Sequence, residues 1–227
     1  MKAFETLDRF TTPDGREVTF HRRDADYFVY LDGDELMSSR APGSERALAE
    51  LACEGLGERP RVLIGGLGLG FTLRAALDLL PSGAEVVVAE LFAKVIEWNR
   101  TWLPDLQGGA LTDRRTRIAH ADVWELVRRD GPWDAILLDV DNGPEAWCFE
   151  SNSRLYDRRG LERIRAALTP GGVVAFWAAQ ADPRFLKTLR KSGFEARRRT
   201  VRAHTGRGAR HTVFVARSQA RRPRRRE

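Results

Sequence analysis

The amino-acid sequence predicts an α/β protein with a doubly wound, Rossmann-like sheet of about seven strands. Four segments, VLIG, VVVA, AILLDV and VVAFWA, are continuously apolar, which is typical of parallel strands that helices cover on both faces. Helix-like segments separate these strands along the chain, as the crossover connections of a parallel sheet require. A glycine-rich turn, GGLGLG, follows the first strand, where a ligand approaches the backbone most closely in such folds.

The N-terminal region is expected to form a small β element over residues 1–43. Short β-like pieces, among them FETLDRF, VTFHRR and YFVYLDGDELM, are separated by the turn-forming triplets PDG and LDG. The pattern changes at Ser44, a candidate N-cap, because SERALAELACEGLG repeats its apolar residues at helical spacing. We therefore expect a first helix from Ser44, and a Rossmann-like domain over residues 44–217.

Strand-like and helix-like segments alternate through the rest of that domain. The helix-like segments after the glycine turn are FTLRAALDLL, AKVIEWNRTWL, VWELVRR, LERIRAAL and PRFLKTLRKSG. The last two strand-like segments, FEARRRTVRA and HTVFVAR, have no long helix between them. This predicts an antiparallel pair at the end of the sheet.

Charge is distributed unevenly along the chain. The formal net charge is +6, but the residues from 196 onward carry +11, which leaves −5 for residues 1–195. Residues 218–227, SQARRPRRRE, contain a proline and no apolar residue except alanine, so we expect a disordered, solvated tail. Contact of this basic tail with nucleic acid is the alternative that its arginines leave open.

The sequence shows no signal for a membrane or a metal. No apolar run is long enough for a membrane helix, and the N-terminus lacks the apolar core of a signal peptide. The two cysteines and four histidines have no metal-ligand spacing. We therefore expect a cytoplasmic protein that needs no metal.

The glycine turn has the spacing G-x-G-x-G, at Gly66, Gly68 and Gly70. The dinucleotide fingerprint G-x-G-x-x-G would need a glycine where Phe71 stands, and the Lys-Ser or Lys-Thr of a P-loop is missing. The turn instead resembles motif I of the class I S-adenosylmethionine-dependent methyltransferases. We therefore expect the glycines to admit an adenosyl sulfonium donor.

Acidic residues stand at the ends of the next three predicted strands. Glu90 is placed to accept hydrogen bonds from both ribose hydroxyls, and Asp122 from the adenine amino group. Capping of the helix that follows is the alternative for Asp122. Asp139 ends the fourth strand and should project into the same crevice, beside the reacting end of the donor.

A narrower resemblance covers most of residues 26–180. YLDGDELMSSR is similar to the LDG strand of spermidine synthase and its relatives, the aminopropyltransferases. VLIGGLGLG resembles their GGGDGG turn, WDAILLDVDNGP their strand ending in DSSDP, and LTPGGVVAF their LKPGGV segment. The resemblance implies that an aspartate at Asp139 deprotonates an attacking amine, with Asp141 as a second catalytic candidate. It also implies a polyamine as acceptor and dimerisation through the N-terminal strands.

Several positions depart from the pattern of that family. Gly68 replaces the aspartate that holds the amine of the donor, Leu36 replaces a glutamine, and Asn142 stands at the second aspartate of DSSD. The tyrosine and the histidine or glutamine before the glutamate of its YHE segment are missing, since PGS precedes Glu45. Because an aspartate would repel the carboxylate of S-adenosylmethionine, Gly68 favours that donor over its decarboxylated form.

The sequence thus favours transfer of a methyl group from S-adenosylmethionine to a small amine or other nucleophile. Candidate acceptor-binding residues are Asn142, Trp147 and Tyr156, the two aromatic rings because they could surround a cation. A polyamine aminopropyltransferase that uses decarboxylated S-adenosylmethionine is one alternative. A catalytically idle nucleoside-binding protein is another.

Overall fold

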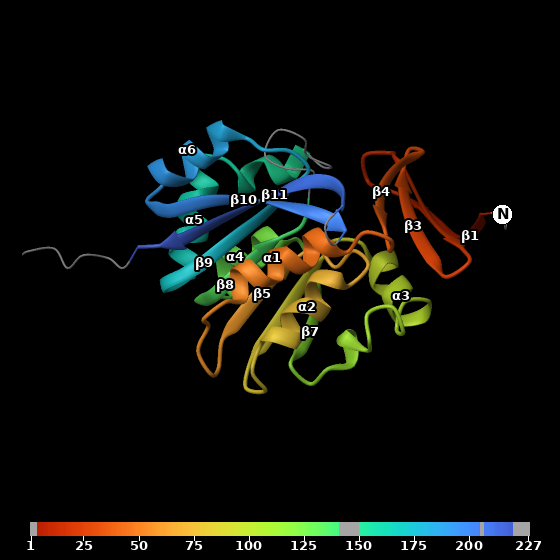
Figure 1. The fold of residues 1–227 in the computed structure, drawn as a ribbon, viewed down its shortest axis with the longest axis horizontal. Helices are drawn as coiled ribbons and strands as arrows, with labels where there is room; N and C mark the ends of the chain where they lie inside the picture. Colours follow the sequence, from red (N-terminus) through yellow and green to blue (C-terminus); the bar gives the residue numbers. More distant parts are fainter. Residues whose placement is uncertain (1–3, 141–149, 205–206, 220–227) are drawn as a thin grey trace, which may run out of the picture.

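The computed structural model describes residues 4–140, 150–204 and 207–219 of the chain. Its strands form two sheets, a four-stranded sheet in the order β1-β2-β3-β4 and a seven-stranded sheet in the order β10-β11-β9-β8-β5-β6-β7. The small sheet lies at one end of the molecule, beside α3 (Figure 1). No helix in these ranges has the length and apolar character needed to cross a membrane.

The small sheet is antiparallel and follows the turns that the sequence predicts. Its strands are β1 (Glu5–Thr11), β2 (Glu17–Arg23), β3 (Asp26–Leu31) and β4 (Asp34–Ser38). The LDG turn joins β3 to β4 with positive φ angles of 50° at Asp32 and 88° at Gly33, a conformation that glycine adopts without strain. The predicted N-terminal β element is therefore present.

The large sheet is mostly parallel, as the continuously apolar strands predict. Its strands are β5 (Arg61–Gly65), β6 (Glu85–Glu90), β7 (Thr116–His120), β8 (Trp133–Leu138), β9 (Leu168–Ala178), β10 (Phe194–His204) and β11 (Arg207–Ser218). The pairs among β5 to β9 are parallel, and β11 is antiparallel to both β9 and β10. The predicted doubly wound fold and its antiparallel final pair are confirmed.

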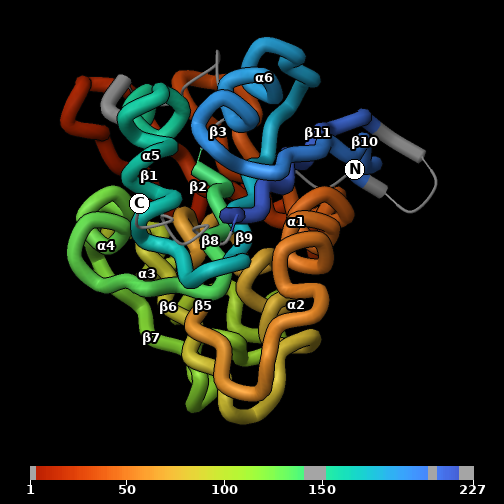
Figure 2. Tube along the Cα trace, turned by 90° about the vertical axis from the view of Figure 1, so that its left-hand side faces the viewer, coloured from red at the N-terminus to blue at the C-terminus, as the bar shows by residue number. Residues whose placement is uncertain are grey.

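Helices cover both faces of this sheet. They are α1 (Gly43–Cys53), α2 (Phe71–Leu79), α3 (Ala93–Thr101), α4 (Val123–Arg129), α5 (Arg158–Ala167) and α6 (Pro183–Lys191), with two 3-10 turns, η1 (Ala110–Thr112) and η2 (Glu150–Leu155). The apolar sides of α1 and α2 pack on one face and those of α4, α5 and α6 on the other. Figure 2 shows these two layers on opposite sides of the strands.

The start of α1 differs from the sequence prediction. The helix begins at Gly43 with Pro42 at the N-cap position, and the Ser44 side chain makes no capping bond. The Ser44 hydroxyl instead donates to Glu45 Oε2 at 2.7 Å. The expected N-cap is therefore wrong, because the helix already begins at Gly43 and Ser44 lies within its first turn.

A third apolar cluster joins the small sheet to the large domain. Val18 and Phe20 from β2 pack with Trp98 from α3, with Leu69 from the turn after β5 and with Phe71 at the start of α2. The small sheet thereby lies against the glycine turn, at the carboxyl edge of the parallel strands. In open α/β sheets this edge is where ligands bind.

Candidate active site

The three glycines of the turn after β5 all have positive φ angles, 88° at Gly66, 52° at Gly68 and 85° at Gly70. A side chain at Gly66 would run into the carbonyl oxygen of Asp139, and at Gly70 a Cβ would lie 2.9 Å from the Cβ of Gln107. These two glycines are therefore required by the protein itself. A Cβ at Gly68 would meet only Met37, with Sδ at 3.4 Å, so the left-handed backbone, more than space, limits which side chain could stand there.

A buried pair of amides, absent from the sequence prediction, holds this turn. Asn99 on α3 donates from Nδ2 to the Gly68 carbonyl at 2.8 Å, and Gln107 donates from Nε2 to the Asn99 carbonyl at 3.2 Å. Both side chains are almost completely buried. The position of Gly68 thus depends on α3, which also packs against the small sheet.

Glu90, at the end of β6, is 6% exposed and ties the turn to the next strand. Its Oε2 accepts from the Leu67 amide and its Oε1 from the Phe92 amide, both at 2.9 Å. Burial raises the pKa of Glu90, although the backbone donors oppose this shift. The Leu91 and Gly68 amides also donate to this carboxylate, so a bound ribose would share its oxygens with backbone donors.

Asp122 caps α4, as the alternative interpretation predicts. Its Oδ1 accepts from the Trp124 amide at 2.8 Å, and its Oδ2 lies against Nη2 of Arg154 in η2. The Arg154 guanidinium in turn lies 5.7 Å from the centre of the Trp124 ring. Asp122 also lines the cavity described below, so helix capping and contact with a nucleobase are compatible roles.

Asp139 follows β8 and faces a second carboxylate, that of Glu45. Thr72 Oγ1, in the first turn of α2, donates to Asp139 Oδ2 at 2.9 Å. Burial, together with the negative charge of Glu45, raises the pKa of Asp139 to about 7. Burial also raises the pKa of Glu45, against the effect of its bond from Ser44.

One cavity brings the predicted residues together. It is lined by all three glycines of the turn and by Glu90, Asp122 and Asp139. Glu45, Thr72, Asn152 and Trp177 add polar groups that the sequence prediction missed. The remaining lining residues are apolar, and many of them come from the small sheet and α3, among them Val18, Leu31, Leu36, Met37 and Trp98.

The ionisable side chains of the cavity share one sign. Glu45, Glu90, Asp122 and Asp139 are acidic, and the described lining includes no arginine, lysine or histidine. Asp122 is paired with Arg154, but Glu45, Glu90 and Asp139 form no ion pair with a described residue. Buried carboxylates without cationic partners are costly, so this arrangement favours a ligand that brings positive charge.

The proposed acceptor-binding residues are placed differently. Tyr156 is 5% exposed and packs in the core against Phe176 and Phe185, with ring centres 5.7 and 5.5 Å apart. It is not among the described residues that line the cavity. Asp141, Asn142 and Trp147 lie outside the described residues.

The sequence is similar to several curated polyamine aminopropyltransferases, although no family model matches it. Identity is 32% over 124 residues with the enzyme of Synechococcus sp., covering 54% of this chain and 38% of the relative. It is 28% over 190 residues with that of Mycobacterium tuberculosis, covering 79% and 35%. With Polyamine aminopropyltransferase 2 of Pseudomonas aeruginosa it is 35% over 124 residues, covering 52% and 33%. The matches thus span well under half the length of these relatives.

Solved structures show the same fold. Spermidine synthase from Thermotoga maritima superposes with a TM-score of 0.74 at 19% identity, over 95% of this chain and 73% of that one. A spermidine synthase in complex with a transition state analogue gives a TM-score of 0.73 at 20% identity, with the same coverage. In sequence the chain is therefore similar to polyamine aminopropyltransferases, and it shares the fold of spermidine synthases.

Proposed function

We propose that the chain transfers an aminopropyl group from decarboxylated S-adenosylmethionine to an amine. The observation that carries this proposal is the uniformly acidic lining of the cavity, formed by Glu45, Glu90, Asp122 and Asp139. Decarboxylated S-adenosylmethionine carries a sulfonium and an ammonium group and no anion. The acceptor amine is also a cation in water, so both substrates complement the charge of the site.

The same observation counts against the methyl transfer that the sequence favours. S-adenosylmethionine would bring a carboxylate into a cavity whose described lining has four acids and no basic side chain, and Arg154, outside that lining, is already paired with Asp122. The relatives that match this chain are polyamine aminopropyltransferases, which agrees with the decarboxylated donor. Methyl transfer stays a second candidate because Gly68 lacks the carboxylate that would most directly repel S-adenosylmethionine.

The proposed reaction is an in-line displacement. Asp139 takes a proton from the ammonium of the acceptor, and the freed lone pair attacks the aminopropyl carbon on sulfur. The C–N bond forms, and the C–S bond breaks as its electrons return to the sulfonium, which leaves as the neutral thioether 5′-methylthioadenosine. The attacking nitrogen ends as an ammonium, and Asp139 returns its proton to solvent.

Each carboxylate has a separate task in this proposal. Glu90 and Asp122 hold the nucleoside, while the glycine turn allows the donor to lie against the backbone. Asp139 accepts the proton, a role that its raised pKa of about 7 suits because a base works best near ambient pH. Glu45 adds negative charge beside Asp139 and so stabilises positive charge on the acceptor.

The test compares both donors on the full chain. Calorimetry should show that decarboxylated S-adenosylmethionine binds about tenfold or more tightly than S-adenosylmethionine, a difference of about 1.4 kcal/mol. Mass spectrometry with 1,4-diaminobutane as acceptor should then detect the aminopropylated product. Tighter binding of S-adenosylmethionine, with a methylated amine as product, would establish methyl transfer instead.

Two variants separate binding from chemistry. Asp139→Asn should keep donor affinity and reduce turnover by about a hundredfold or more, the scale of a lost general base. Glu45→Gln should raise KM for the diamine more than it lowers kcat, because it removes charge without removing the base. Donor binding by the wild-type chain without turnover on any amine tested would favour the idle nucleoside-binding protein.

A further inference from the structure

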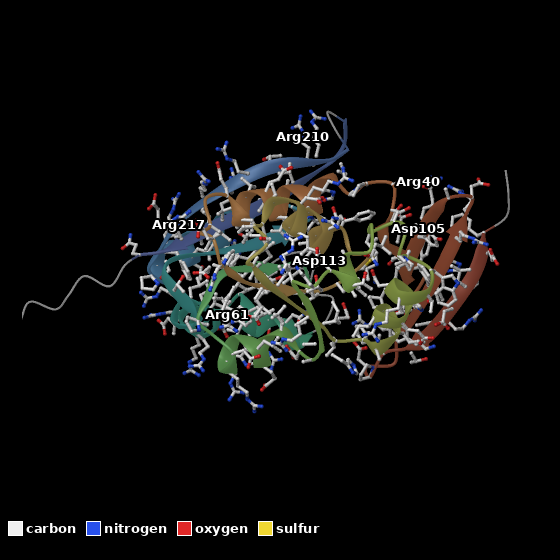
Figure 3. All side chains as sticks on the ribbon, turned by 90° about the horizontal axis from the view of Figure 1, so that it is seen from below. Arg40, Arg61, Asp105, Asp113, Arg210 and Arg217 are labelled. Atoms are coloured by element: carbon white, nitrogen blue, oxygen red, sulfur yellow. The ribbon has the colours of Figure 1, made fainter. Side chains whose placement is uncertain are left out.

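The hairpin formed by β10 and β11 concentrates positive charge at one edge of the large sheet. β10 is the terminal strand of that sheet, paired on one side only. The two strands contain a single acid, Glu195, and seven arginines, namely Arg197, Arg198, Arg199, Arg202, Arg207, Arg210 and Arg217. In Figure 2 the hairpin extends past α1, away from the body of the protein, and Figure 3 shows Arg210 at its outer end.

Five of these arginines form what we call the hairpin arginine cluster, Arg197, Arg198, Arg199, Arg202 and Arg210. All five are exposed, and none forms an ion pair with another described residue. Some exposed arginines elsewhere are compensated: Arg128 and Arg129 pair with Glu125, and Arg158 pairs with Glu162. The cluster is thus a charge concentration that the described part of the fold leaves uncompensated.

The register of the hairpin places like charges against each other. Arg202 is directly opposite Arg210, where side chains on one face of an antiparallel pair are closest. Arg198 shares that face because strand side chains alternate, while Arg197 and Arg199 occupy the other face. Like charges that face each other destabilise a strand pair. An anion bound at this position would therefore reduce the repulsion between Arg202 and Arg210.

The surroundings of the cluster indicate which anion fits. Protein interfaces have an apolar or aromatic centre, but the exposed large apolar residues of the described chain, Phe4, Leu79 and Leu91, all lie outside the hairpin. Single-stranded nucleic acids are held largely by stacking on aromatic rings, and the exposed residues of the cluster are arginines. A two-stranded ribbon with arginines on both faces suits the closely spaced phosphates of a duplex.

We propose that the hairpin arginine cluster binds the phosphate backbone of double-stranded nucleic acid, without reading its sequence. None of the described residues that line the cavity belongs to β10 or β11, so the surface is distinct from the candidate active site. The proposal therefore stands whichever group the enzyme transfers.

The test uses fluorescence anisotropy with the full chain and a labelled DNA duplex of about two helical turns, with an RNA duplex of the same sequence as a second arm. Affinity is measured between about 50 and 200 mM salt, because each neutralised phosphate contributes about −0.9 to the slope of log K against log salt. Arg198→Gln, Arg202→Gln and Arg210→Gln are combined in one variant. Arg128→Gln, Arg129→Gln and Arg158→Gln are combined in a control with the same change in net charge.

The hairpin variant should bind about tenfold more weakly at low salt, and its slope should be shallower by about 2 to 3. Its thermal midpoint should equal or exceed that of the wild type, since repulsion between Arg202 and Arg210 is removed. The control should keep the slope of the wild type. No binding by the wild type at low salt, or equal losses in the two variants, would overturn the proposal.

Discussion

In the proposed site Gly68 lies beside the tail of the donor, so it is the residue at which donor choice is most directly altered. Its φ of 52° is left-handed, a conformation that aspartate and asparagine tolerate better than other residues with a side chain. The nearest atom to a new Cβ would be Met37 Sδ at 3.4 Å, an ordinary contact with a flexible side chain. A substitution by either residue is therefore compatible with the fold.

Gly68→Asp should strengthen the preference for decarboxylated S-adenosylmethionine by about tenfold, equivalent to about 1.4 kcal/mol. The new carboxylate would attract the ammonium of that donor and repel the carboxylate of the other. The ratio of the two dissociation constants, measured by calorimetry, checks the prediction because general damage to the turn weakens both. Gly68→Asn is the uncharged control; an equal change of the ratio in both variants would rule out the electrostatic explanation.

The pairing of Asp139 with Glu45 predicts the pH dependence of the reaction. The carboxyl of Asp139, with its pKa raised to about 7, is protonated and inactive as a base at lower pH. The value of kcat/KM should therefore rise as the pH increases through about 7 and then level off. Glu45→Gln removes a neighbouring negative charge and lowers the pKa of Asp139. The rise of kcat/KM should therefore occur at lower pH in this variant. If kcat/KM rises at the same pH in the variant as in the wild type, a group other than Asp139 controls the pH dependence.

At the scale of elements, the small sheet and α3 form one wall of the cavity. Phe20 on β2 stacks on Trp98 of α3, with ring centres 4.6 Å apart and an angle of 14° between the planes. The indole nitrogen of Trp98 donates to Asp8 Oδ2 at 2.8 Å. Both rings are almost fully buried, so the contact between sheet and helix is an apolar core of its own.

Trp98→Ala should destabilise the fold by about 3 to 5 kcal/mol and also weaken donor binding, because the ring lines the cavity. Phe185→Ala is a matched control, since Phe185, on α6, is 3% exposed in the core on the other face of the sheet. It should cost a similar free energy of unfolding, measured by urea titration, while donor affinity of the folded protein stays near that of the wild type. Equal effects on donor affinity would mean that the wall has no specific role.

The elements were predictable where one local pattern determines them. Strands β5, β6, β8 and β9 are continuously apolar because helices cover both faces, and Glu90, Asp122 and Asp139 follow from their positions at strand ends. The remaining parts of the site come from other elements. Glu45 reaches the cavity from the start of α1 and Thr72 from the start of α2, and no spacing along the chain reveals their meeting with Asp139.

Two further residues show the same limit. Asn99 reads as a polar position in an amphipathic helix, yet its side chain is buried beneath the glycine turn. The sequence predicts that the ring of Tyr156 contacts a cationic acceptor, yet the ring is packed in the core against Phe176 and Phe185. In both cases tertiary packing determines the environment, and local sequence does not contain it.

Across the whole molecule, positive and negative charge are separated. The chain before residue 196 has a net charge of −5, its cavity is lined by acids, and the arginines of β10 and β11 lie at the opposite edge of the sheet order from β7. A cationic donor should be drawn toward the cavity by this field.

The association rate of decarboxylated S-adenosylmethionine should therefore fall several-fold between about 50 and 500 mM salt, as screening shortens the reach of the acidic cavity. Stopped-flow measurement of tryptophan fluorescence can follow binding, since Trp98 and Trp177 line the site. Neutral 5′-methylthioadenosine is the control, and its association rate should hardly change. A common salt dependence for both ligands would argue against electrostatic attraction.

The small sheet supplies Leu36 and Met37 to the cavity, and it rests on the helix whose Asn99 side chain fixes the Gly68 carbonyl. It is therefore not a module that can be exchanged freely between homologues. A chimera that replaced these N-terminal strands would inherit part of the donor pocket of its parent. Divergence in donor preference within such proteins can thus arise from residues that precede the Rossmann-like domain altogether.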